Sequence, residues 1–90
     1  MFMLCRNRVK DFTKWKAIFD THRTVAHGQS GLRLTHMWRE VDDPNNVFFI
    51  FAVEDRSRAE AFVNDPEAAK TGEIAGVIDG ETHFVESVSL

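Results

Sequence analysis

Two histidines lie where the residue pattern predicts an apolar interior. His22 falls on the apolar stripe of a predicted helix. His36 falls on one face of a predicted strand, a face shared with Leu34, Trp38 and Glu40. A histidine that reaches from a helix toward a sheet can act as a general base near neutral pH. The alternative at both positions is an imidazole that only hydrogen-bonds a backbone carbonyl at the rim of the core.

The remaining histidines give little support for a metal site. His27 stands at the predicted helix end, where an imidazole caps carbonyls and complements the helix dipole, and His83 is equally compatible with solvent. His22 and His27 are five residues apart. On an α-helix they would point about 140° away from each other. No HxH or HxxxH pair occurs, and we predict no bound metal.

Glycine spacing argues against a nucleotide cofactor. Gly28 and Gly31 lack the neighbours of a P-loop or of a dinucleotide-binding fingerprint. Cofactor-free chemistry remains open, because an electron-rich phenolic substrate that loses a proton can react with oxygen itself. The protein then supplies only a base, polar groups for the developing oxyanion and an apolar pocket. The glycine spacing therefore predicts no bound nucleotide, and the prediction of a site without any bound cofactor comes from the resemblance described below.

Aromatic residues could form the apolar part of such a site. Trp15 and Trp38 are large enough to stack on an aromatic ligand, although aromatics at these spacings belong to the core in most proteins. Phe51 is a further candidate contact for a small hydrophobic molecule. Its strand resembles the aromatic strand of ferredoxin-like RNA binders, but the flanking Lys/Arg-Gly signature is missing and the net charge is −3.

Length and composition predict one ordered domain, residues 1–90. The 14 acidic and 11 basic residues are interspersed, so no basic stripe is available for nucleic acid or an anionic membrane. No apolar stretch approaches the ~20 residues of a membrane span. The N-terminus also lacks the pattern of a signal peptide, and we predict a cytoplasmic protein. The lone Cys5 is predicted to be a small buried hydrophobe rather than a nucleophile.

Hydrophobic periodicity predicts six elements in the order β-α-β-β-α-β. The first helix begins after Asp11, whose carboxylate can cap its free amides, and the second begins at Asp55 or Ser57 and restarts at Asp65-Pro66. The predicted strands are residues 2–9, 32–41, 47–53 and 81–88, and the first helix carries an apolar stripe of Phe12, Trp15, Ile18, Phe19, His22, Val25 and Ala26.

Connection rules then select the topology. Right-handed crossovers place both helices on one face of a four-stranded antiparallel sheet with the first and third strands central, which is an α+β, ferredoxin-like fold. The strand 47–53 is apolar on both faces, with Phe48 and Ile50 on the side away from the helices. A second copy of the chain, packed sheet to sheet, is the simplest cover, and we predict a homodimer.

With these elements in place, the sequence resembles the small dimeric α/β-barrel proteins. Within them it is most similar to the short antibiotic-biosynthesis-monooxygenase-like or cyclase-like members. The resemblance implies a barrel built from the sheets of two protomers. It also implies a cofactor-free enzyme acting on a small hydrophobic or aromatic molecule, although other members have other activities. It rests on residues 11–22, the turn 42–46, Ala61-Phe62 with Asp65-Pro66, and Ala75-Gly76-Val77.

The same resemblance makes Asn7 a candidate substrate contact. Haem-degrading members carry an Asn late in the first strand, where this chain has Asn7. They also carry a Trp and a His on the second helix, where this chain has Phe62 or Val63 and then Lys70-Thr71. Haem degradation is therefore disfavoured, and Asn7 has the alternative of bonding backbone at the strand end.

Two rival functions use the same fold. A non-catalytic protein would hold or sense a small molecule in the same pocket. A dimerisation module would have no pocket that opens.

Overall fold

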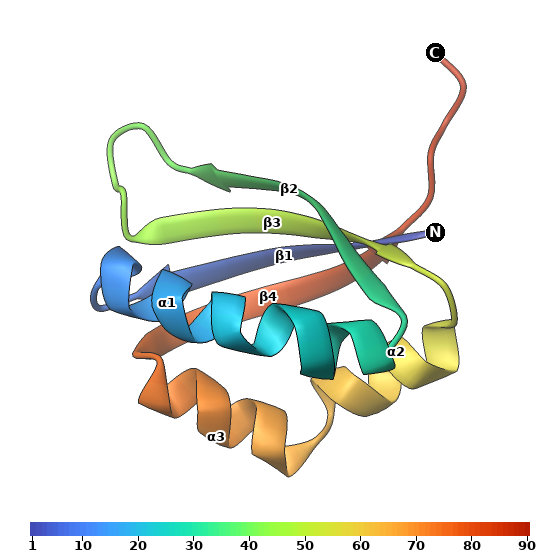
Figure 1. The fold of residues 1–90 in the computed structure, drawn as a ribbon. Helices are drawn as coiled ribbons and strands as arrows, with labels where there is room; N and C mark the ends of the chain where they lie inside the picture. The colour runs from blue at the N-terminus through green and yellow to red at the C-terminus, as the bar shows by residue number, and fades with distance from the viewer.

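The computed structural model describes residues 1–90, except for the side chains at positions 24 and 25. The helices lie on one face of a four-stranded antiparallel sheet of order β2-β3-β1-β4 (Figure 1), so the predicted ferredoxin-like fold is confirmed. Val25, predicted on the apolar stripe, lies outside the described side chains. The elements are β1 (Phe2–Val9), α1 (Phe12–His22) with a π-helical turn (Arg23–His27), β2 (Leu32–Arg39), β3 (Asn46–Val53), α2 (Arg56–Val63), α3 (Pro66–Ile74) and β4 (Val77–Val85).

Aspartates begin all three α-helices, as the sequence predicts. Asp11 accepts a hydrogen bond from the amide of Thr13 at 3.0 Å, and Asp55 accepts one from the amide of Ser57 at 2.9 Å. Asp65 caps α3 in the same way, directly before Pro66. Because proline lacks an N–H, it fits the first turn, where amides have no helical partner. This junction separates α2 from α3.

Aromatic rings from α1 and β3 fill the core between helix and sheet. Trp15 stacks on Phe19 with ring centroids 4.8 Å apart, and Phe19 meets Phe49 edge to face at 5.3 Å. The residues of β1 and β3 that point toward the helices, such as Met3 and Phe51, are each 2% exposed. Alternation along the central strands therefore buries one full face of the sheet.

The opposite face of the sheet, which we call the open face, has no helix over it. On it Leu4 and Trp38 are 37% and 50% exposed. Arg6 crosses to β4, where its guanidinium lies 2.9 Å from carboxylate oxygens of both Asp79 and Glu81. The hydrogen bond from Arg6 holds the pKa of Glu81 below its ordinary value. The open face is thus apolar across its centre and ion-paired toward the β4 edge.

The last strand corrects the sequence prediction. We predicted residues 81–88, which begin after Asp79-Gly80, but β4 spans Val77–Val85. Gly80 pairs with Asn7 inside the ladder. A Cβ at position 80 would stand 2.8 Å from the carbonyl oxygen of Arg6. This glycine therefore serves the close approach of β1 and β4 rather than a turn.

A β-bulge at Thr35 corrects the predicted faces of β2. Leu34 pairs with Phe51 and His36 pairs with Ile50, so Thr35 is an extra residue in the strand. The bulge reverses the alternation after it. Leu34 therefore faces the helices, whereas His36 lies on the open face, although uninterrupted alternation predicted one shared face.

Candidate functional site

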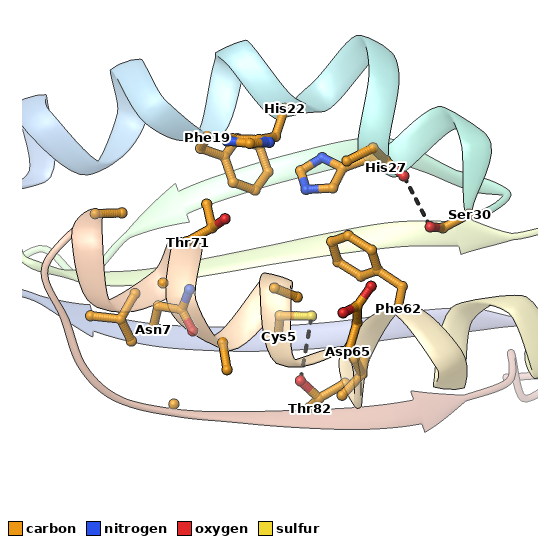
Figure 2. Close-up of a pocket in the computed structure, with 18 of the residues that line it drawn as sticks. Cys5, Asn7, Phe19, His22, His27, Ser30, Phe62, Asp65, Thr71 and Thr82 are labelled. Atoms are coloured by element: carbon orange, nitrogen blue, oxygen red, sulfur yellow. Dashed lines mark hydrogen bonds between the residues drawn. The ribbon is translucent and has the colours of Figure 1, made fainter.

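A cavity of about 810 Å³ lies between the sheet and the helices (Figure 2). Its walls are largely apolar, with Phe19 from α1, Phe51 from β3 and Phe62 from α2. The size and the predominance of apolar lining are typical of sites for small organic molecules. The cavity exists because α2 and α3 cover the β4 side of the sheet with small residues such as Ala68 and Ala69, which leave space above the strands.

Cys5 and Thr82 form part of the cavity floor. They face each other on β1 and β4, and the hydroxyl of Thr82 donates a weak hydrogen bond to the Cys5 sulfur at 4.0 Å. Burial raises the pKa of the Cys5 thiol to about 11. The thiol is therefore protonated at neutral pH and a poor nucleophile, in line with the sequence analysis.

Asn7 adds a carboxamide to the same floor, and Gly80 makes the room for it. The two residues pair across β1 and β4, and both line the cavity. A Cβ on residue 80 would lie only 2.5 Å from the Asn7 Oδ1 atom. The absence of a side chain at position 80 thus lets the Asn7 amide lie over the neighbouring strand.

The π-helical turn brings His22 and His27 to one side of the helix. An α-helix would separate their directions widely, as expected from the sequence, but a π turn bonds residues five apart and so aligns them. Both imidazoles line the cavity (Figure 2). His22 is half-buried, whereas His27 is only 6% exposed. The predicted divergence of these two side chains is therefore wrong.

His27 sits among three phenyl rings. Its ring centroid lies 4.9 Å from that of Phe19, 5.1 Å from that of Phe51 and 5.4 Å from that of Phe62. Burial lowers the pKa of His27 to about 4, with smaller contributions from nearby His22 and Arg23. Its Nδ1 atom is enclosed and has no hydrogen-bond partner among the described residues. The predicted capping of helix carbonyls by His27 is thus not observed.

The other candidate residues divide between the two faces of the sheet. Trp15 and Phe51 line the cavity and also belong to the core. His36 and Trp38 lie on the open face, where their rings stack in parallel with centroids 5.2 Å apart. The cavity therefore gathers His22, Asn7, Trp15 and Phe51 but neither residue of the stacked pair.

Charged side chains at the cavity are acidic. Asp65, Glu67 and Glu73 line it, and all are exposed. Among the described side chains that line the cavity, none is a lysine or an arginine. The electrostatic environment at the mouth is therefore unfavourable to anions.

Metal ligands and membrane spans are not found in the described part of the chain. There, no three His, Cys, Asp or Glu side chains gather as the ligands of a metal ion would. In the same part, no helix has the length and apolar character needed to cross a membrane.

Sequence reasoning missed His27, Phe62 and Thr82 as cavity residues. The sequence analysis placed His27 at a helix end. Its side chain points into the cavity because of the π-helical turn, which the sequence does not predict. Thr82 faces the cavity through its pairing with Cys5. That pairing depends on the register of β4 against β1, which the sequence alone does not determine.

Comparison with known proteins identifies the fold. No protein-family model matches the sequence, and no curated protein matches it. Solved structures do match, at low identity. An uncharacterized NIPSNAP domain protein from Burkholderia xenovorans is 17% identical with a TM-score of 0.64, and the match covers 99% of this chain and 96% of that one.

Two further structures carry names that refer to oxygenation. One is a putative antibiotic biosynthesis monooxygenase from Bacteriodes thetaiotaomicron, with 17% identity, a TM-score of 0.70, and coverage of 99% of this chain and 90% of that chain. The other is SnoaB, a cofactor-independent oxygenase from Streptomyces nogalater, with 19% identity, a TM-score of 0.72, and coverage of 99% and 94%. This chain shares their ferredoxin-like fold. At these identities the likeness concerns the fold, and the activity has to be argued from the site.

Proposed function

We propose that this protein is a small monooxygenase-like or cyclase-like enzyme that acts, without a bound cofactor, on a hydrophobic aromatic molecule held in the cavity. The observation that carries the proposal is the grouping of an imidazole and a carboxamide, those of His22 and Asn7, inside a large cavity walled by aromatic rings. The fold shared with a cofactor-independent oxygenase adds support.

His22 is the base in this proposal. It is half-buried at the cavity wall, so it can exchange protons with water and still face a bound molecule. In cofactor-free oxygenation the base removes a proton from a phenol, and the electron-rich anion reduces oxygen. One oxygen atom enters the substrate as the second carbonyl of a quinone. The other leaves as water, with the hydrogens that the phenol O–H and the attacked ring C–H give up. A cyclase would use the same proton removal to form a carbon nucleophile.

Asn7 would stabilise the negative charge that develops on the substrate oxygen. Its amide N–H groups are donors. The Oδ1 atom is the end of the carboxamide that lies over Gly80, and the residue belongs to the floor of the cavity. Donors fixed before the reaction stabilise a developing oxyanion without reorganisation. Trp15 and Phe51 would contact the apolar rings of the substrate. His36, on the other side of the sheet, is a weaker candidate for the base.

A homodimer formed through the open face belongs to the proposal. Leu4, Phe48, Ile50 and Trp38 form an apolar surface there that no element of this chain covers. A second copy would cover it, as in the barrel arrangement that the resemblance implies. Covering this face would exclude water from the stacked ring of His36 as well. The cytoplasmic location stays a prediction.

The second candidate is a non-catalytic protein that binds or senses a small molecule. The low pKa of His27, about 4, favours it, because the most deeply buried imidazole of the cavity is a weak base at neutral pH. The unreactive Cys5 thiol agrees with this alternative. Under it, the cavity holds the same class of molecule without changing it.

Oxygen consumption with a hydroxyanthrone or naphthol as substrate tests the proposal. His22→Gln should lower the rate at least tenfold while leaving substrate binding within about threefold, because glutamine keeps polarity but cannot act as a base. The matched control is His83→Gln, which changes an exposed histidine outside the cavity. Binding without turnover by the unmodified protein would select the non-catalytic alternative, and neither binding nor turnover would overturn both.

A further inference from the structure

His27 is held in a fixed orientation at the cavity wall. The rings of Phe51 and Phe62 meet its imidazole edge to face, with interplanar angles of 67° and 83°. Phe19 closes a third side at 52°. Figure 2 shows the imidazole between Phe19 and Phe62, directed toward the interior of the cavity. Such packing leaves the ring little freedom to rotate, so its two nitrogens have distinct and constant surroundings.

The surroundings of the two nitrogens determine where the proton resides. Nδ1 is enclosed with no hydrogen-bond partner among the described residues, whereas Nε2 does not share this enclosure. A neutral imidazole carries one N–H. An enclosed N–H without an acceptor is less favourable than an enclosed lone pair without a donor. The favoured tautomer of His27 therefore has its proton on Nε2, the nitrogen that can reach the cavity.

The N–H group at Nε2 of His27 needs a hydrogen-bond acceptor on the ligand. The apolar walls around His27 offer none, since its neighbours there are phenyl rings. A ligand that displaced water from this part of the cavity without supplying an acceptor would leave the N–H unpaired. Such a ligand would lose affinity. A carbonyl or ether oxygen meets the requirement.

The charges at the mouth restrict the acceptor further. A carboxylate or phosphate is a strong acceptor, but Asp65, Glu67 and Glu73 line the cavity and no described cationic side chain does. An anion would therefore be repelled by these carboxylates and would find no cationic side chain in the lining to pair with; Arg23, whose charge acts on His27, is not among the lining residues. An uncharged oxygen acceptor avoids both problems.

We propose that His27 is the specificity-determining residue of this cavity: its Nε2–H donates a hydrogen bond to an uncharged oxygen acceptor of the ligand. It thereby selects against anionic and purely hydrocarbon molecules of the same shape. His27 acts here as a fixed donor and not as a base. The inference rests on the proposed function only in requiring that the cavity hold a small apolar molecule.

Three probes of nearly equal size test this selectivity by calorimetric titration at pH 7. They are 2-acetylnaphthalene, 2-ethylnaphthalene and 2-naphthoate. His27→Phe should weaken binding of the ketone roughly tenfold, which is the usual effect of one lost hydrogen bond. The same variant should change the affinity for ethylnaphthalene by less than about threefold, because the aromatic packing is kept. Naphthoate should bind the unmodified protein at least tenfold more weakly than the ketone.

Nitrogen NMR of the unmodified protein gives a test that does not depend on a folded variant. Two-bond proton–nitrogen spectra at pH 7 should show His27 with the proton on Nε2. The nitrogen shift of Nε2 should move on addition of the ketone and much less on addition of ethylnaphthalene. A proton on Nδ1, or equal responses to the two probes, would overturn the inference.

The outcomes separate this inference from the proposed function. If the ketone and ethylnaphthalene bind and respond equally to His27→Phe, the cavity is a ligand site but His27 does not select. If naphthoate binds as well as the ketone, the exclusion of anions is wrong. If none of the three binds, the proposed use of the cavity fails together with the inference.

Discussion

Protonation of His27 should make this protein sensitive to mild acid. The folded state holds the pKa of His27 at about 4, against an ordinary value of 6.5, chiefly because burial disfavours the charged imidazole. Below pH 6.5 the imidazole of His27 therefore binds a proton in the unfolded chain but stays neutral in the folded chain. The contribution of this group to stability is fully present above pH 6.5, is lost as the pH falls, and is gone near pH 4.

The size of the effect follows from the gap between the two pKa values. Each pKa unit corresponds to about 1.4 kcal/mol, so the gap amounts to about 3 kcal/mol over the whole range. His27 is 6% exposed, which limits screening by solvent. By pH 4.5 about 2 kcal/mol of this should be lost, a large share of the stability of a domain of this size. Positive charge at His22 and Arg23 is already part of this shift, because both disfavour a charged His27.

Urea denaturation between pH 7.5 and pH 4.5 measures this loss. His27→Phe removes the titrating group but keeps a ring among Phe19, Phe51 and Phe62. The difference in unfolding free energy between the variant and the unmodified protein should therefore shift by about 2 kcal/mol in favour of the variant across this range. His83→Gln, at an exposed position, should follow the unmodified protein. Parallel curves for His27→Phe and the unmodified protein would refute the reasoning.

Three more predictions concern the sheet and its two faces. Gly80→Ala should destabilise the fold by about 1–3 kcal/mol in urea, because its Cβ would overlap Asn7 and the backbone of β1. In Gly28→Ala, the control, the Cβ meets no atom within 4 Å and the position is helical, so this variant should be between neutral and about 1 kcal/mol more stable. Equal stability of the two variants would contradict this close packing. The Cys5 thiol should react with iodoacetamide at pH 7.5 at least about 100-fold more slowly in the folded protein than in urea. The reason is that burial raises the pKa of the thiol to about 11. Rapid labelling of the folded protein would show that Cys5 is not buried. Ile50→Lys on the open face should convert the dimer to a monomer and so halve the molecular mass measured by light scattering. The control Ile74→Lys, at an exposed helix position, should leave the mass unchanged. A monomeric unmodified protein would refute the dimer.

The features predicted correctly from the sequence are those that neighbouring residues determine. Asp11, Asp55 and Asp65 cap helices because their carboxylates reach amides two residues on, a geometry that needs no knowledge of the remaining fold. The alternation of β3 likewise predicts that Phe49 and Phe51 are buried together. The order of the strands then follows from general connection rules.

The features predicted wrongly depend on contacts between distant residues. The start of β4 was predicted too late in the chain, because the place of Gly80 in the sheet is determined by its pairing with Asn7, which is far away in sequence. Glycine after aspartate is a strong local turn signal, and tertiary packing overrides it here. The cavity position of His27 depends in the same way on a π turn, whose geometry no local residue preference predicts.

Asn7 illustrates how far resemblance can be taken in predicting a site. The resemblance proposed it as a substrate contact, and in the structure it lies late in β1 on the helix-facing side of the sheet, where it lines the cavity. Its contact with a substrate stays a prediction. His36 was placed by alternation alone, and alternation fails after a bulge. A bulge needs only one extra residue and leaves no clear mark in composition, so the face of a residue beyond it cannot be read from the sequence.

The bulge at Thr35 gives the strand β2 an evolutionary option. Its hydroxyl donates to the carbonyl of Ile50 at 3.1 Å, which ties the extra residue into the sheet. Loss of that one residue would restore regular pleating and would leave His36 opposite Ile50, Met37 opposite Phe49 and Trp38 opposite Phe48, as they are now. If the strand instead kept Thr35 but paired without the bulge, every later side chain would change face. The bulge thus allows one codon to be gained or lost at this point of the strand without redistributing the chemical groups between the cavity and the open face.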